Sequence, residues 1–174
     1  MEKIKNSKAV HALVLFVVFL LVGLVTRPPA LAFPQFYGLH GVLSAPFFAA
    51  VAAWYLKRFG SVGSVFAGVA LLAALLSLMS PVMGMGFALV ALVPTIAYVV
   101  LKAIGFTSYE FVAAVAFGAL CHPAAVLAGA VSGAYLVAGE SLLVQLVMLA
   151  LSVALALFAA LAVRSFGKGA RRTL

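Results

Sequence analysis

Acidic residues are almost missing from this sequence. There is no aspartate, and the three glutamates are Glu2, Glu110 and Glu140. Glu2 is terminal, and the other two are expected on opposite sides of a membrane, so no paired-carboxylate, metalloprotease or catalytic-triad arrangement can be built. No phosphate-binding glycine loop precedes a lysine either. The sequence therefore predicts a protein that is not an enzyme and that has no ATP site or cofactor of its own.

Cysteine is equally scarce. The only one is Cys121, which excludes an internal disulfide and the paired thiolates of a redox enzyme or a zinc site. The three histidines, His11, His40 and His122, fall in different apolar segments, so no closed set of metal ligands is visible. We expect no bound metal.

Charged residues of either sign are few, whereas hydrophobic residues dominate. They make up 8% and 67% of the 174 positions, against about 25% and roughly 45–50% in ordinary globular domains. This composition excludes a soluble fold and predicts one transmembrane domain over residues 1–174. The net charge of +8 does not indicate nucleic-acid binding, because the basic residues lie at the ends of apolar runs, where orientation signals belong.

Six apolar runs predict an all-α integral membrane protein, a bundle of about six transmembrane helices. An upright membrane helix needs about 20 apolar residues. Proline, glycine and charged residues separate the runs, with Arg27, Pro28 and Pro29 ending the first and the segment 80–86 dividing the third from the fourth. The predicted spans are near 9–26, 39–57, 61–79, 86–104, 109–137 and 141–164.

The fifth run is unusual because it is long and carries Pro123 near its middle. One interpretation is a single helix, tilted and kinked at the proline. The other is a pair of half-helices that meet inside the membrane, which is tolerated only where protein or water covers the broken backbone.

The distribution of basic residues predicts the orientation. Ten of the eleven lysines and arginines fall on the side shared by the two termini and the even-numbered loops, and only Arg27 falls on the other. Basic loops stay on the cytoplasmic side. Both termini are therefore predicted to be cytoplasmic, in a multi-pass protein of the cell membrane.

The last span carries a polar stripe. Ser141, Gln145, Met148 and Ser152 share one helix face, and Glu140 stands at its outer start. The face is predicted to point into the bundle, because lipid offers no partner to an amide. It either contributes to a ligand site or holds neighbouring helices together by hydrogen bonds.

His122 lies near the middle of the fifth span, on a face that is otherwise made of small residues. Ionisable side chains are costly at that depth and often functional. Three interpretations stay open: a neutral histidine bonded to a carbonyl beside Pro123, a substrate contact, or a residue in metal binding or proton transfer.

The longest loop, residues 27–38, is aromatic. Phe36 and Tyr37 adjoin His40 and are candidates for a lid over a site on the outer side. Trp54 and Tyr55 precede Lys57 and Arg58 and are expected in the aromatic belt at the cytoplasmic interface.

This arrangement resembles the substrate-binding S component of energy-coupling factor transporters, which has six spans, both ends inside and a long first outer loop. Local sequence over residues 30–135 is similar to the thiamine-precursor (hydroxymethylpyrimidine) branch of that family. The similar residues are Tyr37-Gly38, Ala53-Trp54-Tyr55 leading to Arg58 and Gly60, Ala67-Gly68 and Ala73-Ala74.

The resemblance implies capture of a vitamin or vitamin precursor from outside, in a complex with a transmembrane coupling subunit and two ATPases. S components often carry alanines four apart in the first span for docking on the coupling subunit, whereas this chain has only Ala9 and Ala12 there. Alanine pairs four apart occur elsewhere, at Ala49 and Ala53, Ala70 and Ala74, and Ala156 and Ala160.

The leading hypothesis is therefore the substrate-binding membrane subunit of a micronutrient transporter, with a flat organic ligand. The alternatives are a membrane scaffold without a small-molecule ligand and an autonomous channel or proton-coupled carrier. The substrate and the oligomeric state are left open. The expected lining of the site is Phe36, Tyr37, His40, Met83, Met85, His122, Tyr135, Glu140, Ser141 and Gln145.

Reporter fusions test the orientation. Fusions after Lys8, Arg58, Lys102 and Arg172 should all report the cytoplasm, and one placed within residues 27–38 should report the outside, because basic loops resist translocation. An external C-terminus would contradict the six-span topology.

Overall fold

The described part of the chain is built of helices alone. The computed structural model describes residues 7–33, 38–132 and 141–169, and no strand occurs among them. The helices are α2 (Lys8–Leu31), α3 (Leu39–Phe59), α4 (Val62–Met79), α5 (Pro81–Ala103), α6 (Tyr109–Ala119), α7 (Cys121–Ser132) and α9 (Leu142–Gly169).

Most of these helices are long and apolar enough to cross a membrane. Five pass that test singly, and α6 with α7 makes a sixth span if the pair, bent by 41°, is counted as one. The leucines, valines and phenylalanines on their outer surfaces are exposed, as expected where lipid is the solvent. The chain is an all-α, multi-pass membrane protein, as its composition predicted.

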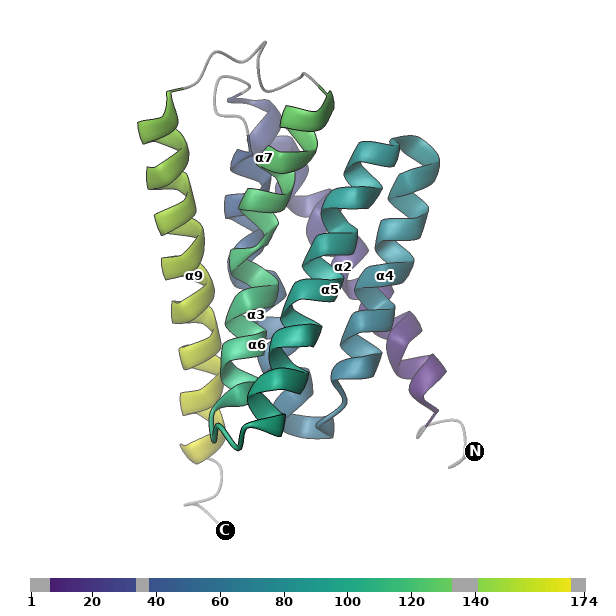
Figure 1. Cartoon of the computed structure of the whole chain (residues 1–174), viewed down its shortest axis with the longest axis vertical. Helices are drawn as coiled ribbons and strands as arrows, with labels where there is room; N and C mark the ends of the chain where they lie inside the picture. Colours follow the sequence, from purple (N-terminus) through teal and green to yellow (C-terminus); the bar gives the residue numbers. More distant parts are fainter. Residues whose placement is uncertain (1–6, 34–37, 133–140, 170–174) are drawn as a thin grey trace.

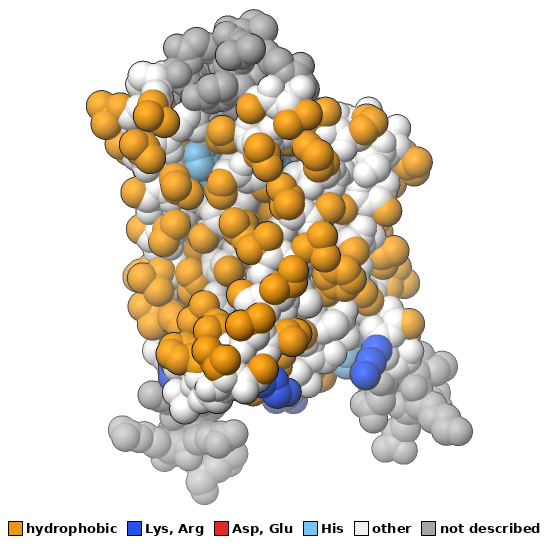
Figure 2. Space-filling view, viewed as in Figure 1, with side chains coloured by type: hydrophobic (Ala, Val, Ile, Leu, Met, Phe, Trp, Pro, Cys, Tyr) orange, Lys and Arg blue, Asp and Glu red, His pale blue; other side chains and the backbone are white. Residues whose placement is uncertain are grey.

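The helices stand side by side, and α2 crosses the others obliquely (Figure 1). Helix α3 is central, because it packs against α2, α6, α7 and α9. Helix α2 begins and α9 ends at the same end of the bundle. On the face shown in Figure 2, the lysine and arginine side chains gather at this end, and hydrophobic side chains are spread over the described surface above them. We refer to it as the charged end.

Two helix ends differ from the predicted ones. Helix α2 continues through Arg27, Pro28 and Pro29 to Leu31, since the φ of proline is compatible with a helix, although each ring removes one backbone hydrogen bond and crowds the carbonyl four residues earlier. The Ala32 N–H donates to the Pro28 carbonyl at 3.2 Å, so helical bonding extends past both prolines. The three residues therefore do not end the helix.

The second difference is between α4 and α5, where Ser80 alone is the connection. Pro81 occupies the first turn of α5, where its missing N–H costs nothing, so this helix begins before the predicted residue 86. Gly84 and Gly86 are inside the helix and allow close contact. A Cβ built on Gly86 would lie 3.0 Å from the Ala124 carbonyl oxygen.

The interior contains one cluster rich in aromatic rings and a second cluster made of small residues. Phe19 and Phe48 stack with ring centroids 4.5 Å apart, in the larger cluster of buried residues. Where α3, α6 and α9 meet, Ala49 and Ala156 are fully buried. A Cβ on Gly118 of α6 would collide with the Ala45 carbonyl and lie 2.8 Å from the Ala49 Cβ. These small residues allow the helices to approach closely.

A matched pair of substitutions tests this packing. Gly118→Ala should lower the free energy of unfolding by about 1–3 kcal/mol, because the added methyl has no space. Gly23→Ala is the control, since a Cβ there would meet nothing within 4 Å. Reversible unfolding in mixed micelles measures both. Equal stability of the two variants would contradict the close approach.

Candidate functional site

Hydrogen bonds join α2 to α3 at the end of the bundle opposite the charged end. Thr26 Oγ1 lies 3.2 Å from His40 Nδ1 and 2.9 Å from Ser44 Oγ. The Ser44 hydroxyl donates to the His40 carbonyl at 2.7 Å. Thr26 and Ser44 are buried. We call these three residues the polar cluster.

The Thr26 hydroxyl carries a single hydrogen but has several partners within reach. The Val22 carbonyl lies at 2.9 Å and can only accept, and Ser44 Oγ and His40 Nδ1 lie at 2.9 and 3.2 Å. Whether His40 or Thr26 donates in their contact depends on the tautomer of the imidazole. When Nδ1 of a neutral ring carries the proton, Nε2 is left as an acceptor.

The partner of His122 determines its tautomer. Its Nδ1 lies 3.2 Å from the Gly38 carbonyl oxygen, which only accepts, so Nδ1–H donates and Nε2 of the neutral ring is the acceptor. The ring is 2% exposed. Gly38 has a φ of 85°, and a Cβ there would lie 2.9 Å from the ring. A neutral histidine bonded to a carbonyl was one of our interpretations, but the carbonyl belongs to Gly38 rather than to a residue beside Pro123.

The other expected site residues fall into three groups. Gln145 is buried on the inward face of α9 with Met148 and Ser152, as the stripe predicted, whereas the exposed Ser141 caps the helix by accepting from the Val144 N–H at 3.3 Å. Met83 and Met85 are exposed. Four residues lie outside the described part of the chain: Phe36, Tyr37, Tyr135 and Glu140.

The structure therefore places His40 and His122 on the packed helices α3 and α7, with His122 against Gly38, two residues before His40. It adds Thr26 and Ser44, which the sequence analysis missed. The available signals were the position of Ser44, one helical turn after His40, and the position of Thr26, a hydroxyl in an otherwise apolar run. Neither signal indicates the partner, because Thr26 and His40 belong to different helices.

No protein-family model, curated protein or solved structure matches this chain. Function must therefore be inferred from the site. Within the described residues, no group of three or more histidine, cysteine or acidic side chains could hold a metal ion. What the polar cluster and His122 offer is hydrogen bonding by imidazole and hydroxyl groups.

The third histidine belongs to the charged end. His11 Nδ1 lies 2.8 Å from the Tyr55 hydroxyl, and the two rings also pack on Phe59. Tyr55 is 3% exposed and Trp54 is 54% exposed. Trp54 is therefore placed as an interfacial aromatic residue should be, whereas Tyr55 is a buried partner of His11 and not part of an exposed belt.

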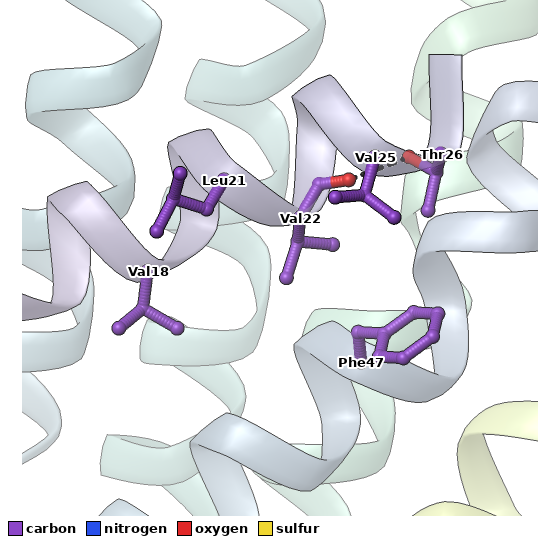
Figure 3. Close-up of a pocket in the computed structure, with 6 residues that line it drawn as sticks. All are labelled: Val18, Leu21, Val22, Val25, Thr26 and Phe47. Carbon is purple, nitrogen blue, oxygen red and sulfur yellow. Dashed lines mark hydrogen bonds between the residues drawn. The ribbon is translucent and has the colours of Figure 1, made fainter. Parts of the chain in front are cut away.

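A groove on the side of the bundle, between α2 and α3, does not suit a polar solute (Figure 3). Its volume is about 250 Å³, and three of its lining residues, Leu21, Val25 and Phe47, are half exposed or more. The Thr26 hydroxyl donates to the Val22 carbonyl and adds no free donor to the groove. The groove therefore faces lipid. The full lining is Val18, Leu21, Val22, Val25, Thr26 and Phe47.

Replacing Thr26 by valine tests the polar cluster. The change keeps the shape but leaves His40 Nδ1 and Ser44 Oγ without their partner on α2, so the free energy of unfolding should fall by about 1–3 kcal/mol. Thr95→Val is the matched control, because the Thr95 hydroxyl bonds only within its own helix, to the Ala91 carbonyl. Unfolding in mixed micelles compares them. A Thr26→Val variant as stable as the control would exclude the cluster as a link between helices.

Proposed function

We propose that this protein is the substrate-binding membrane subunit of a transporter that takes up a small organic micronutrient across the cell membrane. The supporting observation is the pair of imidazoles on α3 and α7, far from the charged end. His122 has its Nδ1–H committed to the Gly38 carbonyl, which leaves Nε2 as an acceptor, and His40 Nδ1 is paired with Thr26 Oγ1. Buried polar groups of this kind fix the orientation of a ligand in an otherwise apolar site.

The chemistry of the two rings limits the ligand. An Nε2 lone pair accepts from an N–H or O–H, so the ligand should carry amino, amide or hydroxyl donors. The aromatic and methionine content of the sequence suits a flat organic body, which stacking and dispersion can bind where charges are scarce. The scarcity of acidic residues disfavours a strongly cationic molecule. A vitamin or vitamin precursor with exocyclic donors meets these conditions.

Packing weakens the alternative of a ligand-free scaffold. Three alanine pairs were candidates for contact with other membrane chains, but Ala49, Ala156 and Ala160 are fully buried against their own bundle. Their small size is explained by packing within the chain. Of the three pairs, only Ala70 and Ala74 on α4 are both at least partly exposed. A coupling subunit and ATPase subunits belong to the proposal, because this sequence has no nucleotide-binding motif.

Histidine-to-asparagine variants separate ligand binding from structure. The asparagine amide takes the place of the Nδ1–H donor but has nothing at the position of Nε2. His122→Asn and His40→Asn should therefore fold and bind the ligand about 5- to 150-fold more weakly, the equivalent of roughly 1–3 kcal/mol. His11→Asn, at the charged end, is the control and should bind normally.

Native mass spectrometry of gently purified protein identifies the ligand, and equilibrium binding in nanodiscs measures the affinities. Two outcomes count against the proposal. One is a ligand whose affinity is the same in all three variants. The other is the absence of any bound metabolite together with no binding across a panel of vitamins and vitamin precursors.

A further inference from the structure

The helical hydrogen-bond ladder is interrupted between α6 and α7. The axis bends by 41° at Leu120, and Pro123 follows in the first turn of α7. Proline has no N–H, so it cannot donate to the carbonyl four residues earlier, which belongs to Ala119. Inside a membrane, a carbonyl without a donor is expensive, because no water replaces the lost bond.

A side chain from another helix supplies a donor. The Ser152 hydroxyl of α9 donates to the Ala119 carbonyl at 3.3 Å. Ser152 is fully buried, and 33 residues separate the two groups in the sequence. The ladder resumes immediately afterwards, where the Ala124 N–H donates to the Leu120 carbonyl at 3.0 Å.

Protein covers the interruption on the other side as well. A Cβ built on Gly41 of α3 would lie 2.5 Å from the Cys121 carbonyl oxygen and 2.6 Å from the His122 Cα. The backbone of α3 therefore lies directly against the start of α7. This close approach is also what brings the His122 ring to the Gly38 carbonyl.

We propose that Ser152 is a positioning residue, which replaces the missing proline N–H as the donor to Ala119 and so holds the bend that sets His122 against Gly38. Within the inward polar stripe on α9, Ser152 then has a specific role as the donor to Ala119. The proposal concerns the bend and does not depend on whether the protein binds a micronutrient.

The chain contains its own reporter of the bend. Cys121 is the only cysteine, it is 6% exposed, and its thiol donates to the Phe117 carbonyl at 3.3 Å, next to the interruption. In the intact protein, bulky water-soluble thiol reagents should label it slowly. Opening of the bend should raise the labelling rate.

A double-mutant cycle tests the proposal. Ser152→Ala should raise the rate of Cys121 labelling about tenfold, the equivalent of about 1.4 kcal/mol in the opening equilibrium. Pro123→Ala restores a backbone N–H four residues after Ala119, so adding Ser152→Ala to it should change the rate less than twofold. Ser165→Ala is the control on the same helix, because the Ser165 hydroxyl bonds only to Ala162 in its own helix.

A second readout distinguishes positioning from general stability. In ¹⁵N spectra of the histidine rings, the Nδ1 signal of His122 should lose its hydrogen-bonded character in Ser152→Ala and keep it in the double variant. If Ser152→Ala fails to fold while the double variant folds, the proposal is supported. Three outcomes would overturn it. Ser152→Ala could have the same effect with and without Pro123, it could have no effect when Pro123 is present, or both the single and the double variant could misfold.

Discussion

Every backbone or side-chain polar group inside a membrane must find its partner within the protein, and the rest of this structure depends on that constraint. Thr26, Ser77 and Thr95 bond to carbonyls of their own helices, whereas Ser152 bonds to a carbonyl of another helix. At the charged end, the Lys57 ammonium donates to the Val163 and Arg164 carbonyls, at 3.3 and 3.2 Å. These bonds from Lys57 and Ser152 attach α9 to the bundle at two levels.

Close approach of helix backbones is a second requirement. It follows from the need of polar groups in the membrane to find partners within the protein. A hydroxyl on one helix reaches a carbonyl on another only if the two axes are near. Gly41 and Gly118 provide that proximity, since a Cβ at either position would collide with a neighbouring backbone. Lipid tails are as apolar as leucine, so shape complementarity of this kind, and not hydrophobic burial alone, favours helix association. The close approach at Gly41 and Gly118 and the bend between α6 and α7 therefore depend on the same helix packing.

The two histidines illustrate how such packing creates chemistry. A lone imidazole in an apolar run has no defined tautomer. Once the Gly38 carbonyl is placed beside His122, Nδ1 becomes the donor and Nε2 an acceptor, and His40 Nδ1 is paired with Thr26 Oγ1. The histidine at the charged end is engaged differently, with the Tyr55 hydroxyl and the ring of Phe59. The bundle therefore distinguishes three residues of the same type by their neighbours.

The sequence by itself determined the membrane class, the approximate positions of the apolar spans and the inward direction of Gln145 and Ser152, because these depend on composition and helical period. It also restricted the fifth span to a kinked helix or two half-helices. Only the tertiary structure decided that the interruption is at Leu120 and that α2 continues past Pro29. Only the tertiary structure paired Thr26 with His40, Ser152 with Ala119 and His122 with Gly38. The two partners of each pair come from different segments of the chain, and a hydrogen bond between segments produces no periodic pattern in the sequence.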